Sequence, residues 1–256
     1  MKMRRLATTG VALVAVLGLG LTGCGGRDGS TGRGTATAST SSTPDPTGEL
    51  TAAVRRLNEQ SMRVEVTSSM LTASGVVDPT TRAMDVTLSL GDLGEVHCLA
   101  IGDDAYVKLS GALGTQLGGA KKWLHMDAGK LSGGQLGLMP ADDPGGVKKL
   151  LSAVVDVRRT GDRSYAGTLD YTRTGADPKS LAAAGDKAKA VPFTAAADEQ
   201  GRLTAFEMDM AAIDPALGKM TVSYRDFGMP VQLSKPPAAD TEEAPAELAR
   251  AFTGGS

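Results

Sequence analysis

Alternating apolar and polar residues constrain the fold of this chain more than any other feature of the sequence. In residues 62–70 and again in residues 83–90, most even-numbered positions are apolar and most of their neighbours are polar. Successive side chains of a strand point to opposite faces of a sheet, so a period of two predicts half-buried strands. The chain therefore contains strands with one apolar face.

Further strands and three helices complete the expected order of elements. Short runs joined by turns such as Gly102-Asp103-Asp104 favour antiparallel strands, which we expect at residues 95–101, 105–109, 121–126, 155–160, 164–172, 191–197, 202–210 and 219–227. One helix is expected at residues 50–57, where apolar side chains recur with helical spacing. Asp143-Pro144 and Asp177-Pro178 each supply a helix N-cap and a first-turn proline. The fold class is α+β, with a single strongly curved antiparallel sheet and about three helices on one face.

The N-terminus has the features of an export signal. Three basic residues precede an apolar, uncharged run from residue 6 to residue 21, and the run ends in Leu21-Thr22-Gly23-Cys24. This ending resembles the lipobox of bacterial lipoproteins, in which the cysteine is joined to diacylglycerol and becomes the first residue after cleavage. The alternative is an uncleaved transmembrane helix, but the run falls short of about 20 residues. We expect residues 1–23 to be a signal peptide and Cys24 to be the site of lipidation.

The rest of the chain divides into three segments. After the cysteine, residues 24–46 consist mainly of Gly, Ser, Thr, Ala and Pro, which predicts a disordered tether. Residues 47–234 contain all the predicted helices and strands and are expected to form one domain. Residues 235–256 contain two early prolines and four acidic residues, which predicts an acidic, flexible tail, frayed or with a short surface helix.

Charge and cysteine content exclude several classes of protein. Without residues 1–23 the net charge falls from −2 to near −5, because that segment holds three basic and no acidic residues. No basic stripe is available to follow a phosphate backbone, so we expect no nucleic-acid partner. With Cys24 used for the anchor, Cys98 is left without a disulfide partner. The domain must therefore rely on a hydrophobic core, which a folded part of this length can bury.

The chain resembles the actinobacterial LppX/LprAFG lipoproteins, which are relatives of the LolA-like lipoprotein carriers. The resemblance rests on the lipobox, the tether, the order of elements and a few local stretches, which are residues 102–108 (GDDAYVK), 122–124 (KWL), 177–178 (DP) and 224–231 (YRDFGMPV). It covers about residues 47–234 and implies a half-barrel whose sheet wraps helices around an apolar cavity. Members bind lipids or lipoglycans for transport across the envelope, and no catalytic residue carries over. This chain departs from the family in its few aromatic residues, its free Cys98 and its acidic tail, which bear on the ligand more than on the fold.

Methionine is abundant on the predicted apolar strand face, whereas aromatic residues are scarce. Methionine is unbranched and polarizable, which suits a surface that repacks around varied ligands. The side chains that we expect to line a lipid-binding cavity are Met62, Val64, Met84, Val86, Leu88, Val107, Met126, Phe206, Met208, Met210 and Val222. The same pattern is also typical of an ordinary core packed against helices, so a hollow and a packed interior both fit the sequence.

Residues with catalytic or metal-binding chemistry do not combine into a recognisable site. His97 and Cys98 are adjacent in a predicted strand and point to opposite faces, so we expect no metal site and a buried, unreactive Cys98. Asp103-Asp104 and Asp142-Asp143 lie at a turn and at a helix start, where aspartate caps backbone N–H groups. The sequence contains no nucleophile elbow, zinc-protease motif or P-loop.

Two glycine-rich segments and Trp123 are candidates for the rim of the cavity. Residues 111–119 and 132–146 are expected to be mobile loops at the mouth of the cavity, acting as a lid. Trp123 is either a rim residue beside those loops or part of the core, and its apolar bulk favours the core. Neither assignment implies catalysis.

The sequence therefore predicts a non-enzymatic protein, lipid-anchored at the extracytoplasmic face of the cell membrane through Cys24. Its interior is expected to bind the acyl chains of a lipid or glycolipid non-covalently, without a cofactor, with an envelope transporter as a candidate partner. The alternative is a cell-surface scaffold or sensor of the same fold with a packed interior. A hydrolase ranks third, because no usable nucleophile–base pair is present.

Overall fold

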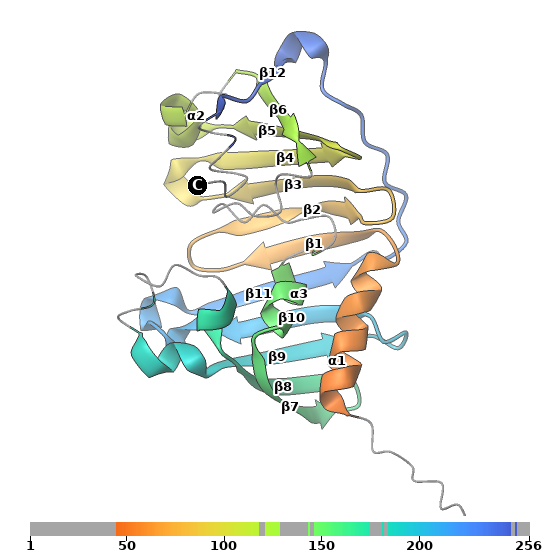
Figure 1. The fold of residues 1–256 in the computed structure, drawn as a ribbon, viewed down its shortest axis with the longest axis vertical. Coiled ribbons are helices and arrows are strands. Elements are labelled where there is room, and N and C mark those ends of the chain that lie inside the picture. The colour runs from red at the N-terminus through yellow and green to blue at the C-terminus, as the bar shows by residue number, and fades with distance from the viewer. Residues whose placement is uncertain are drawn as a thin grey trace, which may run out of the picture. The chain divides into compact units, whose positions relative to one another are not determined.

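The computed structural model describes residues 45–117, 121–128, 143, 146–174, 181, 184–246 and 249. All of these residues belong to one compact unit. Its main element is a single curled sheet of twelve strands that does not close on itself, with β12 at one edge and β7 at the other (Figure 1). The strand order is β12-β6-β5-β4-β3-β2-β1-β11-β10-β9-β8-β7. An open sheet curled in this way is consistent with the expected half-barrel.

The strands follow the predicted periodicity, with two additions. Their bounds are β1 (Met62–Thr67), β2 (Thr72–Asp78), β3 (Ala83–Ser89), β4 (Glu95–Ile101), β5 (Asp104–Leu109), β6 (Trp123–Asp127), β7 (Val154–Gly161), β8 (Ser164–Leu169), β9 (Val191–Ala197), β10 (Leu203–Asp209), β11 (Lys219–Arg225) and β12 (Thr241–Glu243). All neighbours are antiparallel except β12, which runs parallel to β6. Strands β2 and β12 are not among the predicted ones, and β12 lies in the segment expected to be a flexible tail.

The first helix, α1 (Pro46–Arg55), begins as the sequence dictates. The Asp45 carboxylate accepts hydrogen bonds from the N–H groups of Thr47 and Gly48, each at 3.1 Å, and Pro46 occupies the first turn. The helix buries Leu50, Ala53 and Val54, and the short 3₁₀ turn η1 (Arg56–Asn58) extends it and buries Leu57. Its apolar side faces the sheet next to β7 and β10 (Figure 1).

The other helices agree only in part with the prediction. Helix α3 (Val147–Leu151) follows Asp143, whose carboxylate accepts from the N–H groups of Lys148 at 2.7 Å and Lys149 at 3.0 Å. Helix α2 (Gly111–Leu117) forms where a mobile loop was predicted. The helix predicted from Asp177 falls largely on residues outside the described ranges, and its end forms the 3₁₀ turn η6 (Gly185–Lys189).

Five further 3₁₀ turns lie between the described strands and helices. They are η2 (Gly91–Leu93), η5 (Tyr171–Thr174), η7 (Met210–Ala212), η8 (Pro215–Leu217) and η9 (Ala238–Asp240). One hydrophobic cluster unites the inner face of the sheet with α1 and α3, and within it Phe193 and Phe206 stack with ring centroids 5.1 Å apart. Side chains in the interior are therefore positioned by the inner face of the sheet and by α1 and α3, which belong to the same cluster.

Candidate functional site

The residues predicted to line a cavity come together on one face of the sheet. All of them are buried except Leu88, which is partly buried and packs against the others. Met210 lies in η7, just beyond the end of β10, rather than on a strand. The alternation of the sequence was thus enough to place these side chains on one face.

Strand register arranges these side chains in rows across the inner face. Val86 lies opposite Cys98, and Cys98 lies opposite Val107, so one row crosses β3, β4 and β5. On the other half of the sheet, Val222 lies opposite Phe206, and the two belong to the same cluster as Leu50 and Leu57 of the first helix. In the half formed by β7 to β11, the interior is therefore occupied by helix side chains.

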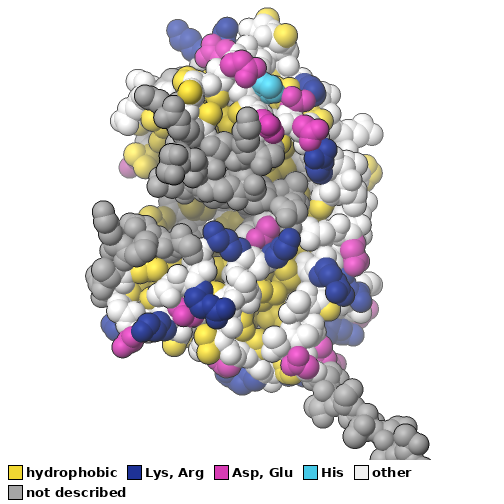
Figure 2. All heavy atoms as spheres, viewed as in Figure 1, with side chains coloured by type: hydrophobic (Ala, Val, Ile, Leu, Met, Phe, Trp, Pro, Cys, Tyr) yellow, Lys and Arg dark blue, Asp and Glu magenta, His cyan; other side chains and the backbone are white. Residues whose placement is uncertain are grey.

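A pocket lies between α1 and α3. It has a volume of about 550 Å³ and is lined by Thr51, Val54, Arg55, Asn58, Lys148, Leu151 and Ser152. Val54 is buried in the hydrophobic cluster and Leu151 packs against it, so the apolar floor of the pocket continues into the core. On the face that carries α1 and α3, Figure 2 shows hydrophobic side chains at the surface with Lys and Arg side chains beside them.

A buried polar atom lies beside this opening. The Oδ1 atom of Asn58 is buried and has no hydrogen-bond partner among the described residues. Leaving a buried acceptor unpaired costs free energy, so such an atom calls for a donor from outside the chain, such as water or a ligand. The pocket thus combines an apolar floor, two cationic side chains at its mouth and one unsatisfied acceptor.

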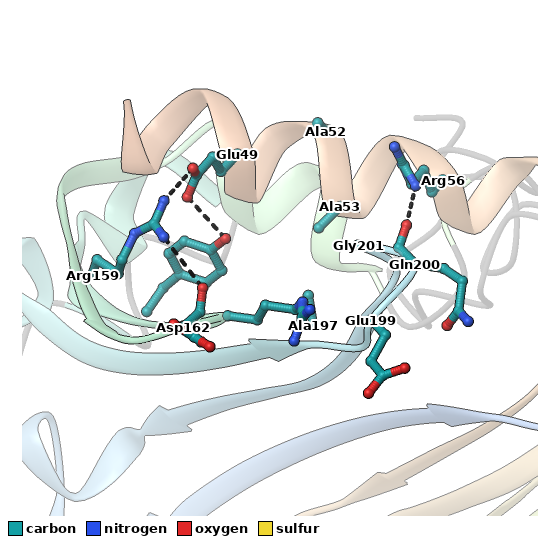
Figure 3. Close-up of a pocket in the computed structure, with 12 residues that line it drawn as sticks. Glu49, Ala52, Ala53, Arg56, Arg159, Asp162, Ala197, Glu199, Gln200 and Gly201 are labelled. Atoms are coloured by element: carbon teal, nitrogen blue, oxygen red, sulfur yellow. Dashed lines mark hydrogen bonds and ion pairs between the residues drawn. The ribbon is translucent and has the colours of Figure 1, made fainter. Parts of the chain in front are cut away.

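A second pocket, of about 360 Å³, lies between α1 and the turns that join β7 to β8 and β9 to β10 (Figure 3). Several of its polar groups are held by contacts within the protein. The Glu49 carboxylate accepts from the Arg159 guanidinium and from the Tyr165 hydroxyl, and the Arg56 guanidinium donates to the Gln200 carbonyl. Burial, together with the bond to Glu49, raises the pKa of Tyr165. These contacts hold α1 against the sheet, and the charged side chains of Asp162, Arg163 and Glu199 also line the pocket.

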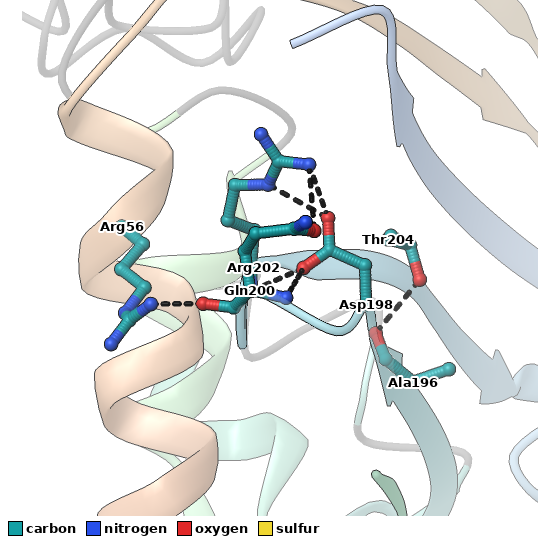
Figure 4. A network of polar contacts seen from close by, with 6 residues as sticks. All are labelled: Arg56, Ala196, Asp198, Gln200, Arg202 and Thr204. Atoms are coloured by element: carbon teal, nitrogen blue, oxygen red, sulfur yellow. Dashed lines mark hydrogen bonds and ion pairs between the residues drawn. The ribbon is translucent and has the colours of Figure 1, made fainter. Parts of the chain in front are cut away.

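The β9–β10 turn continues that network (Figure 4). The Asp198 carboxylate accepts from the N–H groups of Gln200 at 3.0 Å and Arg202 at 2.9 Å, and from Arg202 Nε at 2.7 Å. Burial alone would raise the pKa of Asp198, but the hydrogen bonds from Arg202 lower it on balance. The Arg202 guanidinium lies 4.3 Å from the ring centroid of Phe227, so this turn is built for rigidity.

His97 and Cys98 lie on opposite faces of β4. His97 Nε2 is 2.7 Å from Asp85 Oδ1 on the outer face, whereas Cys98 is buried in the core. Burial raises the pKa of the Cys98 thiol to about 12, so it stays protonated at neutral pH. In the part of the chain that the structure describes, no group of three or more His, Cys, Asp and Glu side chains is arranged to hold a metal ion.

Trp123 corrects one of the predictions. It lies on the outer face of β6 and is partly exposed, with its ring 4.8 Å from that of His97 and 5.8 Å from the Lys108 ammonium. The reason is strand parity, because Leu124 and Met126 take the inward positions of β6. Trp123 therefore belongs to neither the core nor the pocket.

Asp103 and Asp104 bind neighbouring surface segments, whereas the predicted N-terminal signal lies outside the described residues. Asp103 binds Arg82 at 2.7 Å, and Asp104 binds His125 and Lys235, so both carboxylates hold surface segments together. Asp142, Cys24 and the predicted signal peptide lie outside the described residues. Among the helices that are described, none has the length and apolar character needed to cross a membrane.

Comparison with known proteins gives structural likeness but no sequence relative. No family model matches the chain, and no curated protein matches it. The crystal structure of the Mycobacterium tuberculosis lipoprotein LppX is similar, with a TM-score of 0.46 and 18% sequence identity over 73% of this chain and 97% of that chain. The function of this protein must therefore be inferred from its own residues and their arrangement.

Proposed function

We propose that this protein is a membrane-anchored extracytoplasmic lipoprotein that binds the acyl chains of a lipid or glycolipid non-covalently in the interior of its curled sheet. The observation that carries this proposal is the opening of about 550 Å³ between α1 and α3, whose apolar floor continues into the core. An acyl chain entering there passes polar side chains such as Thr51 and Ser152 before it reaches the apolar Val54 and Leu151. The polar head group stays at the mouth, beside Arg55, Lys148 and the unpaired oxygen of Asn58.

The composition of the interior supports a ligand without a fixed shape. Met62, Met84, Met126 and Met208 all lie in the buried cluster, and flexible thioether side chains rearrange at low cost around a guest. Each fully buried side chain of Met or Leu size contributes about 1.5–3 kcal/mol of apolar burial. A few such contacts with an acyl chain suffice for binding after the cost of ordering the chain is subtracted.

The sequence around Cys24 supports the location. Its likeness to a lipobox implies two acyl chains at the start of the mature protein, which anchor firmly where a single chain holds only marginally. The tether then gives the domain freedom to move at the membrane surface, as a carrier between a membrane and an envelope transporter requires. No covalent chemistry is part of the proposal, because the protonated Cys98 thiol faces apolar side chains.

The second candidate function is a cell-surface scaffold or sensor with a packed interior. One observation favours it: α1 and α3 already fill the inner face over β7 to β11 with buried side chains such as Leu50, Val54 and Val147. In that case the pocket is a surface depression, and the protein carries no lipid.

Native mass spectrometry of the full chain, followed by organic extraction, separates the two functions. Purification from an actinobacterial membrane should yield acyl lipid in stoichiometric amount in addition to the lipids on Cys24. We expect Met84→Glu, which places a charge in the interior, to lose this bound lipid. The matched control is Thr87→Glu on the outer face of the same strand, which should keep the lipid. Full lipid content in a folded Met84→Glu protein contradicts a lipid-binding interior, and a lipid-free wild type supports the scaffold.

A further inference from the structure

The large apolar side chains that the described part of the structure leaves exposed all lie at one end of the sheet. They are Met70 (70% exposed), Leu93 (55%), Leu117 (45%) and Val155 (62%). The pairing register places them at the same strand ends, with Val155 at the far edge of the sheet: Thr67 pairs with Thr72 next to Met70, Ser89 pairs with Glu95 next to Leu93, and Val154 pairs with Leu169 next to Val155. Helix α2, which carries Leu117, follows the end of β5 at Leu109, opposite Val96. We name this the apolar end.

Among the described residues, no exposed large apolar side chain lies at the opposite end of the sheet. Its turns consist of residues 79–82 between β2 and β3, Gly102-Asp103 between β4 and β5, Asp162-Arg163 between β7 and β8, and residues 198–202 between β9 and β10. Charged side chains there pair across turns, as Arg82 does with Asp103, whose side chain is 81% exposed. Single exposed apolar residues are ordinary on a protein surface. Their restriction to one end, where Asp92 and Glu95 are exposed as well, is what requires an explanation.

In the loops that carry Met70 and Leu93, several backbone N–H groups are hydrogen-bonded within the loop. Around Met70, Ser68 N donates to the Leu71 carbonyl at 2.9 Å, and Ser68 Oγ accepts from the N–H groups of Met70 and Leu71. Around Leu93, Leu90 N donates to the Gly94 carbonyl at 2.9 Å, and Leu93 N donates to the Leu90 carbonyl. Backbone N–H groups that enter an apolar phase must be paired internally, so these loops are suited to immersion.

We propose that the apolar end docks on a lipid bilayer surface, the one in which Cys24 is anchored, with Met70, Leu93 and Leu117 inserted among the lipids. Their spacing argues for lipid over protein. The three side chains lie on successive connections, each about 10 Å from the next because neighbouring strands are 4.7–4.9 Å apart. Separate apolar tips insert individually into a fluid surface, whereas a protein partner or a second copy needs a continuous patch with complementary packing.

The tether is long enough for this contact. It joins α1 near the charged end, since Glu49 of α1 binds Arg159 and Tyr165 close to the β7–β8 turn. The 21 residues from Cys24 to Asp45 reach about 70 Å when extended. A seven-residue strand spans only about 24 Å. The apolar end can therefore meet the membrane that holds the anchor, and this inference goes beyond the proposed lipid-binding interior.

A fluorophore that senses lipid tests the docking on the full, lipidated chain. A Leu93→Cys variant is labelled with NBD, and the matched control is Asp103→Cys at the charged end. Labelling is selective because Cys24 is acylated and the buried Cys98 thiol has a pKa of about 12. Each protein is reconstituted in vesicles of phosphatidylethanolamine and phosphatidylglycerol that carry a shallow doxyl quencher. We expect the quencher to lower the NBD signal several-fold at position 93 and hardly at all at position 103.

Two further outcomes overturn the proposal. Equal quenching at positions 93 and 103 means that the domain has no preferred face toward the bilayer. Self-quenching at position 93 that rises with protein concentration assigns the apolar end to a second copy. In the Leu93→Cys background, Met70→Ser combined with Leu117→Ser should restore most of the signal. The readout needs no interior cargo, so a lipid-free interior with strong quenching refutes the proposed function and leaves docking intact.

Discussion

Gly167 of β8 lies where the neighbouring strands β7 and β9 leave no room for a side chain. A Cβ atom there would lie 2.0 Å from the Asp156 carbonyl oxygen and 2.8 Å from a ring carbon of Phe193. The carbonyl belongs to the neighbouring strand, so it cannot move away without separating β7 from β8. We expect Gly167→Ala to lower the free energy of unfolding by about 2–4 kcal/mol, measured by urea denaturation.

Gly161, at the end of β7, provides the matched control. A Cβ atom there meets only Ser164 atoms at 3.5 Å and beyond, which is ordinary van der Waals contact. Gly161→Ala should therefore change the stability by about 0.5 kcal/mol at most. Similar losses of stability in both variants would mean that the close approach of the strands does not cause the destabilisation of Gly167→Ala.

At the scale of single residues, strand parity in the sequence was a better guide than residue type. It correctly separated His97 from Cys98, and it placed Met84 and Phe206 in the buried cluster. Trp123 was assigned to the core on its apolar bulk, although its parity matches that of the outward-facing His125. The unpaired Oδ1 of Asn58 could not be foreseen, since it depends on how η1 packs beside the sheet.

The short strand β12 is held at the sheet edge by a histidine that bridges two carboxylates. His125 Nδ1 lies 2.7 Å from Glu243 of β12, and His125 Nε2 lies 2.8 Å from Asp104 of β5. Lys235, on the approach to β12, also binds Asp104 at 2.6 Å. The hydrogen bond to Glu243, followed by that to Asp104, raises the pKa of His125 above its ordinary value near 6.5.

The raised pKa makes the attachment of β12 depend on pH. Protonated His125 donates to both carboxylates, whereas the neutral ring donates to only one. Its stabilising effect is thus complete below pH 6.5 and is lost as the pH rises through the higher folded pKa. We expect the amides of β12 to lose protection from hydrogen exchange over that range, after correction for the intrinsic pH dependence of exchange.

A histidine-free variant provides the control for this pH effect. His125→Gln keeps a hydrogen-bonding side chain but cannot titrate, so the protection of β12 should no longer change with pH across the neutral range. The amides of β10, in the middle of the sheet, serve as an internal reference in both proteins. An unchanged pH profile in His125→Gln would show that another group controls the edge.

At the scale of elements, the sequence predicted those with a strong apolar period and missed those without one. Strand β2 presents Ala73, Gly75 and Val77 at its inward positions, too small a stripe to show a period of two. A Cβ at Gly75 would lie 2.0 Å from the Asp85 carbonyl oxygen, so the close approach of β2 and β3 requires glycine at this position. This glycine in turn weakens the apolar alternation of β2 in the sequence. Strand β12 has no apolar stripe and depends on β6, a partner distant in the sequence.

For the whole molecule, the sequence was sufficient to predict a curled antiparallel sheet but not the pocket between α1 and α3. The apolar face follows from alternation, and the antiparallel order follows from short turns. The pocket depends on where α1 and α3 meet, and that position is set by tertiary contacts such as the bond between Glu49 and Arg159. The grouping of exposed apolar side chains at one end likewise appears only once the strand order is known.

The opening between α1 and α3 can be closed without adding charge to the core. Leu151 lines it and is only partly buried, so Leu151→Trp fills the space at modest cost to packing, whereas Leu151→Met preserves the volume. A ligand present at a hundred times its Kd adds about 2.7 kcal/mol to stability. Extraction of bound lipid should therefore lower the Tm of the wild type and of Leu151→Met, but should leave Leu151→Trp unchanged. If extraction lowers the Tm of Leu151→Trp as much as that of the wild type, lipid enters the interior by a route other than this opening.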